Sequence, residues 1–150
     1  NRAAGNRLRS IIMLGGIMKK VNVLWIIPVL FVLSGCMTGD VSSDGAVLKQ
    51  YLDPAALKEL TENPKSDIWI IDVRPLSAYN AGHIPTAKSY PSTEVMSRIS
   101  ELPKTQYLIV YCQTGGRAGA VISKLEKEGY TRMMNWGGYT RWPYEFEKSE

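Results

Sequence analysis

Residues 107–117 have the sequence YLIVYCQTGGR and come directly before a segment with helical periodicity. The first five residues form a short apolar run rich in β-branched and aromatic side chains, which is typical of a strand buried on both faces. Gly115 and Gly116 follow, and glycines permit the backbone angles of a tight loop. The stretch therefore predicts a strand, a loop and a helix, with Cys112 at the point where the strand ends.

This placement favours a reactive thiolate at Cys112. A tight loop between a strand and a helix directs several backbone N–H groups at one point, at the positive end of the helix dipole. Because a thiolate is an anion, we expect the pKa of the Cys112 thiol to lie below its usual value of about 8.5. Arg117 adds a permanent positive charge. The alternative is an inert core cysteine, since free cysteines are among the most buried residues.

The segments on either side predict alternating strands and helices. Asp53 and Pro54 are typical of a helix start, and Gly129 is typical of a residue that ends a helix. We expect strands at 67–73, 107–111 and 131–135 and helices at 54–61, 93–100 and 118–128. The pattern predicts a three-layer α/β domain with a mainly parallel central sheet flanked by helices.

Ligands of open α/β sheets bind beyond the carboxyl ends of the strands. Asp72 lies near the end of one predicted strand and Cys112 at the end of another. We therefore expect the two side chains to face one cleft. The chain has two Cys and one His, whereas zinc sites typically use four protein ligands or three and a water molecule. We accordingly expect neither a metal nor another cofactor.

The formal charge of +4 is unevenly distributed along the 150 residues. Residues 1–36 contain five of the 18 Lys and Arg side chains and no Asp or Glu. Residues 37–150 therefore contain 13 basic and 14 acidic side chains, a net charge of −1. Nucleic-acid binding loses its main electrostatic support in that part of the chain, and we expect no nucleic-acid partner. The length suits one domain and a leader.

The leader has the pattern of an export signal. Met18, Lys19 and Lys20 precede an apolar run from Val21 to Leu33, which at 13 residues is too short for a membrane-spanning helix. The run ends in the sequence LSGC at 33–36, which resembles the bacterial lipobox, in which the cysteine is lipidated. An ordinary secretory signal or an uncleaved anchor is the alternative. Residues before Met18 are interpreted as an upstream extension.

Four segments are therefore expected: an upstream extension at 1–17, a lipoprotein signal peptide at 18–35, the lipidated Cys36 with a flexible tether to residue 46, and a folded domain at 47–150. Cys36 would attach the protein to a membrane facing the periplasm or the cell exterior. Met37 is not the Asp that is linked to inner-membrane retention in many Gram-negative bacteria, which favours the outer membrane if the organism is Gram-negative. Lipidation would leave Cys112 as the only free thiol; a Cys36–Cys112 disulfide is the less favoured alternative.

Three separated segments together resemble the single-domain rhodanese family of sulfurtransferases, over about residues 47–146. The first joins IDVR at 71–74 to YNAGHIPTA at 79–87, similar to the family's Asp-x-Arg and Gly-His-Ile motifs. The second is the loop from Cys112 to Arg117. The third runs from Gly129 and Tyr130 through WGGYTRW at 136–142, similar to the family's Gly-Gly-x-x-x-Trp ending.

The resemblance implies that Cys112 takes sulfur from a donor such as thiosulfate, carries it as a persulfide and passes it to a thiol or cyanide. It also implies that the loop holds the donor and the persulfide, with the loop residues Gln113, Thr114, Gly115, Gly116 and Arg117. Four residues separate Cys112 from Arg117, where the related phosphatases have five. Gln113 stands where many thiosulfate-using members have Arg.

Asp72, Arg74 and His83 are interpreted as supporting residues: the first two as a buried structural pair and His83 as a hydrogen-bonded scaffold residue. The alternative functions are a non-catalytic persulfide carrier or protein-binding module and, less favoured, an enzyme resembling phosphatases or arsenate reductases. A thiolate in an oxidising compartment is prone to sulfenic acid and mixed disulfides, so a periplasmic thiol-reducing protein is an expected partner.

Overall fold

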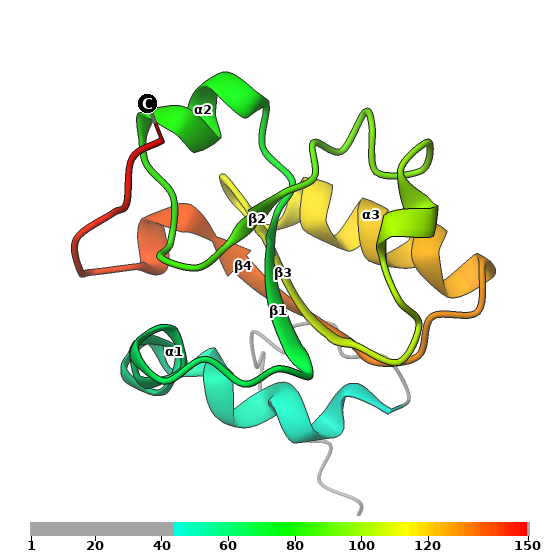
Figure 1. Ribbon diagram of the computed structural model, residues 1–150, viewed down its shortest axis with the longest axis horizontal. Helices are drawn as coiled ribbons and strands as arrows, with labels where there is room; N and C mark the ends of the chain where they lie inside the picture. The colour runs from blue at the N-terminus through cyan, green and yellow to red at the C-terminus, as the bar shows by residue number, and fades with distance from the viewer. Residues whose placement is uncertain (1–43, 150) are drawn as a thin grey trace, which may run out of the picture. The chain divides into compact units, whose positions relative to one another are not determined.

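A parallel sheet of four strands, in the order β2-β1-β3-β4, forms the middle layer of the computed structural model, which describes residues 44–149 (Figure 1). Every pair of neighbouring strands is parallel. The strands are β1 (Ile68–Asp72), β2 (Lys88–Ser89), β3 (Tyr107–Cys112) and β4 (Met133–Gly138). The predicted α/β architecture with a parallel sheet is confirmed.

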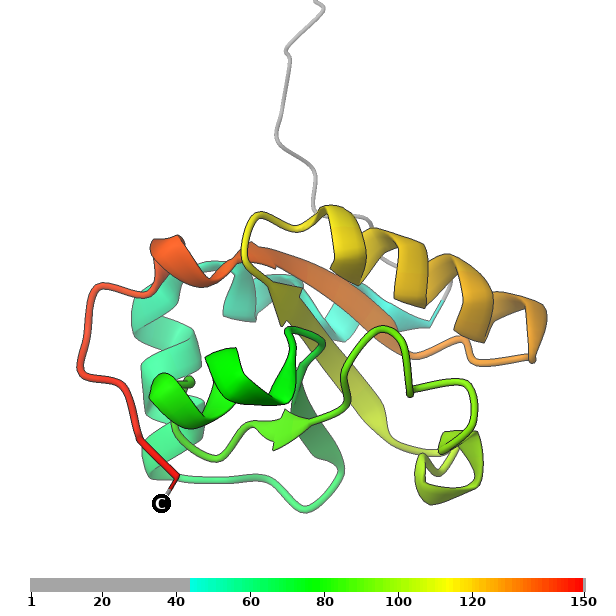
Figure 2. The same ribbon diagram turned by 90° about the horizontal axis from the view of Figure 1, so that it is seen from above.

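Helices cover both faces of the sheet (Figures 1 and 2). On one face α3 packs over Leu108, Val110 and Cys112 of the third strand; on the other, α1 and the 3-10 helix η1 belong to the core that contains Ile109 and Tyr111. This alternation is the two-residue period of a strand buried on both sides. The helices are η1 (Gly45–Leu52), α1 (Pro54–Glu62), α2 (Leu76–Ala81), η2 (Ile99–Glu101), α3 (Gly116–Lys127) and η3 (Tyr139–Arg141).

The two longest α-helices have the local signals that the sequence suggested. Asp53 Oδ1 accepts a hydrogen bond from Ala55 N at 2.9 Å at the start of α1, with Pro54 as its first residue. Gly129, just beyond α3, has a φ of +84°, a left-handed conformation that favours glycine. These boundaries follow from local chemistry, which explains why they were predictable.

Two predicted elements differ in the structure. Turns occupy residues 92–98 in place of the expected helix at 93–100, and only Ile99–Glu101 forms a 3-10 helix. Ser97 Oγ donates to Glu94 O at 2.7 Å, a side-chain bond that competes with regular helix formation. The last strand begins at Met133 and continues to Gly138, beyond the predicted end at 135.

Residues just before Val47, where the folded domain was predicted to begin, already contact it. Asp44 N donates to Thr131 O at 2.8 Å, Thr131 Oγ1 donates to Asp44 Oδ2 at 2.8 Å, and Gly45 begins η1. The predicted extension at 1–17, signal peptide at 18–35 and lipidation site Cys36 lie outside the described residues. Between residues 44 and 149, no helix has the length and hydrophobicity of a membrane span.

Candidate active site

Cys112 is the last residue of β3, and its side chain is directed toward α3. The residue is 1% exposed. Gly115 N donates a hydrogen bond to Cys112 Sγ at 3.1 Å, and α3 begins at the next residue, Gly116. Gly115 has a φ of +101°, which a residue with a Cβ adopts only with strain. The backbone therefore turns around the sulfur atom in the way that the Gly-Gly sequence suggested.

The surroundings of Cys112 favour the thiolate. Burial is the largest single influence and raises the pKa of the thiol, because it disfavours a charged sulfur. Hydrogen bonds from the backbone N–H groups of Ala118, Thr114, Gly115 and Arg117 act in the opposite direction and together outweigh it, so the pKa of Cys112 is lowered. This direction agrees with the expectation from the sequence. Ala118 was not among the predicted residues; its place in the first turn of a helix is the signal that could have found it.

The remaining side chains of the loop face outward. Gln113, Thr114, Gly116 and Arg117 are exposed, whereas Gly115 is buried. Arg117 lies in the first turn of α3, where its guanidinium is free of burial and can meet an incoming anion. The loop thus combines a buried sulfur atom with a polar rim that carries one permanent positive charge.

The end of β4 supports the loop from behind. Cys112 pairs with Gly138 in the sheet. A Cβ added to Gly138 would lie 2.8 Å from Gln113 O, and one added to Gly115 would lie 3.1 Å from the Cα of Gly137. Both distances are shorter than ordinary van der Waals contact. Gly138 of β4 and Gly115 of the loop are therefore needed for the close approach of backbone to backbone.

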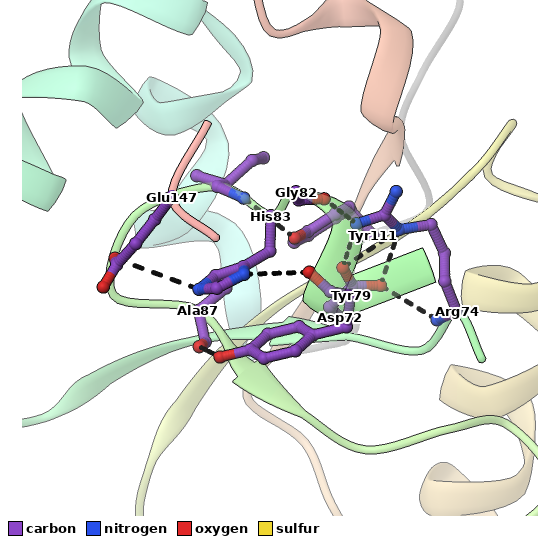
Figure 3. Close-up of polar contacts among 9 residues, drawn as sticks. Asp72, Arg74, Tyr79, Gly82, His83, Ala87, Tyr111 and Glu147 are labelled. Atoms are coloured by element: carbon purple, nitrogen blue, oxygen red, sulfur yellow. Dashed lines mark hydrogen bonds and ion pairs between the residues drawn. The ribbon is translucent and has the colours of Figure 1, made fainter. Parts of the chain in front are cut away.

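Asp72 and Arg74 form a buried ion pair at the end of β1, shown in Figure 3. Arg74 donates to the carboxylate from its backbone N at 2.9 Å, from Nε at 3.0 Å and from Nη2 at 2.6 Å, and Nη2 also donates to Gly82 O at 2.7 Å. The Arg74 guanidinium carbon lies 4.1 Å from the centre of the Tyr139 ring. Asp72 is 0% exposed. The sequence led us to expect that Asp72 and Cys112 face one cleft. In the structure Arg74 encloses the Asp72 side chain, which does not face such a cleft.

Tyr111 and His83 complete this buried network (Figure 3). Tyr111 Oη accepts a hydrogen bond from Ile84 N at 3.1 Å, and burial, followed by the charge of Asp72, raises the pKa of Tyr111. His83 stacks on Tyr79 with ring centres 3.8 Å apart, and its Nδ1 lies 3.0 Å from Tyr79 O. Its backbone exchanges two hydrogen bonds with Glu147, at 2.8 and 2.9 Å. These contacts are those of scaffold residues.

Metal coordination has no candidate among residues 44–149, where no three His, Cys, Asp or Glu side chains come together. The disposition of groups around Cys112 is instead suited to nucleophilic chemistry. An ionised sulfur held by backbone N–H groups can attack an electrophilic atom and carry the transferred group as an anion in the same cradle.

Comparison with known proteins agrees with this chemistry. Residues 53–144 match the family described as rhodanese-like domain, which confirms the resemblance found in the sequence. A sulfurtransferase from Allochromatium vinosum is 32% identical over 77 residues, covering 51% of this chain and 72% of that protein. The thiosulfate sulfurtransferase GlpE from Pseudoalteromonas translucida is 29% identical over 79 residues, 52% of this chain and 75% of that protein. A rhodanese-like domain protein from Staphylococcus aureus is structurally similar, with a TM-score of 0.57 and 26% identity over 65% of this chain and 95% of that one.

Proposed function

The chain belongs to the rhodanese-like domain family, and we propose that it is a sulfurtransferase in which Cys112 carries the transferred sulfur. The observation that carries the proposal is the set of backbone N–H groups around Cys112 Sγ, which favours an anionic sulfur in spite of burial. Such a cradle stabilises both the thiolate that attacks the donor and the persulfide anion that results.

The proposed reaction has two displacements at sulfur. The Cys112 thiolate attacks the outer sulfur of thiosulfate; the bond between the two thiosulfate sulfurs breaks, and sulfite leaves with the bonding electrons. The outer sulfur of the resulting persulfide is then attacked by a thiolate or by cyanide, and Cys112 leaves as the thiolate. No external oxidant or reductant is consumed. Arg117 supports this route because an exposed guanidinium beside the loop binds the anionic oxygens of the donor.

The experiment is sulfur loading of the full chain with thiosulfate, followed by intact mass spectrometry. We expect the protein to gain one sulfur atom and, after cyanide is added, to lose it as thiocyanate. Cys112→Ala should gain none, whereas Cys36→Ala, which removes the other cysteine of the sequence, should behave as wild type.

Other results would change the proposal in different ways. Loading from glutathione persulfide but not from thiosulfate would reject thiosulfate as the donor and keep the sulfurtransferase. Loading without release to cyanide or to small thiols would favour a carrier that delivers sulfur to one partner protein. A wild type that takes sulfur from neither donor, or a Cys112→Ala variant that takes it normally, would contradict the proposal.

A further inference from the structure

Asn135 lies where the pairing of β3 with β4 becomes irregular. Val110 pairs with Asn135, but the next residue of β3, Tyr111, pairs with Gly137, so that Trp136 is an extra residue on β4. Such a bulge bends a strand and redirects its side chains. Trp136 is fully buried and donates from Nε1 to Tyr51 O at 2.7 Å. The bulge thus places the indole in the core and leaves Asn135 beside the loop that follows Cys112.

The side-chain amide of Asn135 joins two backbone segments. Its Oδ1 accepts a hydrogen bond from Gly137 N at 2.9 Å, and its Nδ2 donates to Gly115 O at 3.1 Å. The first bond links a residue to the backbone two positions on, a local arrangement that asparagine forms readily. The second spans 20 residues of sequence. One half-buried amide therefore ties the end of β4 to the loop around the sulfur.

Gly115 is the residue through which this contact reaches Cys112. Its N–H donates to Cys112 Sγ at 3.1 Å, while its carbonyl accepts from Asn135 Nδ2 and, at 2.9 Å, from Gly119 N in the first turn of α3. Gly115 has a φ of +101°, and glycine has no side chain to restrict its backbone. Hydrogen bonds to the neighbouring peptide groups must therefore fix its orientation.

We propose that Asn135 is a positioning residue that holds Gly115 with its N–H directed at Cys112 Sγ. The inference rests on the proposed function only in taking Cys112 as the nucleophile. Without the bond from Nδ2, the carbonyl of Gly115 keeps its helical partner Gly119, but the link to β4 is lost. The hydrogen bond from Gly115 N to Cys112 Sγ is then formed less often, and the thiolate is less well stabilised.

The charges near the loop make this effect measurable. The sequence of β4, MMNWGG, contains no titratable side chain. The first turn of α3 contributes Arg117, which is exposed, and η3 contributes Arg141, which donates to Trp136 O. On β1, Asp72 is enclosed by Arg74. A change in the ionisation of Cys112 on removal of the Asn135 amide therefore reports the backbone cradle and not the loss of a neighbouring charge.

The test is the pH dependence of Cys112 alkylation by iodoacetamide, measured in Asn135→Ala and Asn135→Asp, each with Cys36→Ala as background. We expect the pH at which the alkylation rate is half its maximum, the alkylation midpoint, to rise by about half a unit in Asn135→Ala. Below that pH the alkylation rate should fall roughly threefold. Asn135→Asp keeps an acceptor for Gly137 N but replaces the donor to Gly115 O by a carboxylate, whose charge also disfavours the thiolate, so its midpoint should rise further; Asn135→Ala alone removes the contact without adding a charge. Sulfur transfer is not needed for this readout, so the proposed function and this inference can fail separately.

Gln106→Ala is the matched control. Gln106 Nε2 donates to Ser66 O, also at 3.1 Å, from a half-buried position just before the opposite end of β3. Gln106→Ala should lower the thermal midpoint of unfolding about as much as Asn135→Ala does. It should leave the pH midpoint of Cys112 alkylation unchanged. An unchanged midpoint in Asn135→Asp or Asn135→Ala, or an equal shift in Gln106→Ala, would overturn the proposal.

Discussion

The carboxyl ends of β1 and β3 lie side by side in the sheet, and each stabilises the ionised form of a buried side chain in a different way. At the end of β1, Asp72 is neutralised by Arg74, whose guanidinium and backbone N take up its carboxylate oxygens. At the end of β3, Cys112 is surrounded by backbone N–H groups, which are dipoles without net charge. Both residues are buried, but the oxygens of Asp72 are bonded to a cation, whereas the sulfur of Cys112 is bonded only to backbone N–H groups.

The difference shows that the kind of partner decides whether a buried anion is structural or reactive. A cation at hydrogen-bond distance compensates the charge completely and fixes the geometry. Several N–H dipoles lower the energy of the ionised form and leave the atom free to form a bond. The neighbouring strand ends thus supply a buried ion pair at β1 and, at β3, the cysteine proposed as the nucleophile.

The largest expected effect comes from breaking the support at β1. Arg74→Ala leaves the carboxylate of Asp72 buried without its cation, which should cost about 3–5 kcal/mol in the free energy of unfolding. Urea denaturation measures the loss. The matched control is Arg98→Ala, which removes the half-exposed pair with Glu101 and a hydrogen bond to Ser89 O; this loss should be much smaller, because solvent screens the pair. Equal losses in the two variants would show that the β1 pair is not the support described here.

An intermediate effect is expected where Gly137 and Gly138 of β4 approach the loop that contains Gly115 and Gly116. Gly138→Ala places a Cβ 2.8 Å from Gln113 O, so the loop must move, at a cost of about 1–3 kcal/mol. The rate of Cys112 alkylation at neutral pH should fall with it. In Gly116→Ala, the new Cβ meets no atom within 4 Å, and alanine in a helix should be neutral or stabilising by up to about 1 kcal/mol. A stable Gly138→Ala variant with normal alkylation would refute the role of β4 behind the loop.

The smallest effect concerns the ionisation of Cys112 itself. Hydrogen bonds from the backbone outweigh burial and lower the pKa of the thiol, so the alkylation rate in Cys36→Ala should fall with decreasing pH through a midpoint below that of an ordinary thiol. The same chain unfolded in urea is the reference, since unfolding removes the cradle. Its midpoint should return to about 8.5. A folded midpoint at or above the unfolded one would mean that burial dominates.

Local chemistry explains what the sequence could reveal. The buried strand before Cys112, the cap at Asp53 and the glycine after α3 all depend on residues close together in the chain. The contact from Asn135 to Gly115 and the bonds from His83 to Glu147 depend on strand pairing and on the path of the last segment, which periodicity does not encode. The bulge at Trp136, whose indole is buried in the core, likewise depends on strand pairing and tertiary packing.

The burial of Cys112 also means that the two sulfur atoms of the proposed persulfide lie at different depths below the surface. The residue is 1% exposed, while its neighbours Gln113 and Thr114 lie at the surface. In the proposed persulfide, the outer sulfur stands one S–S bond, about 2 Å, beyond the inner one. A bulky acceptor thiol therefore meets the sulfur to be delivered before it can approach the sulfur that holds it. Delivery is favoured over attack on the inner atom, which would join the acceptor to the protein as a mixed disulfide.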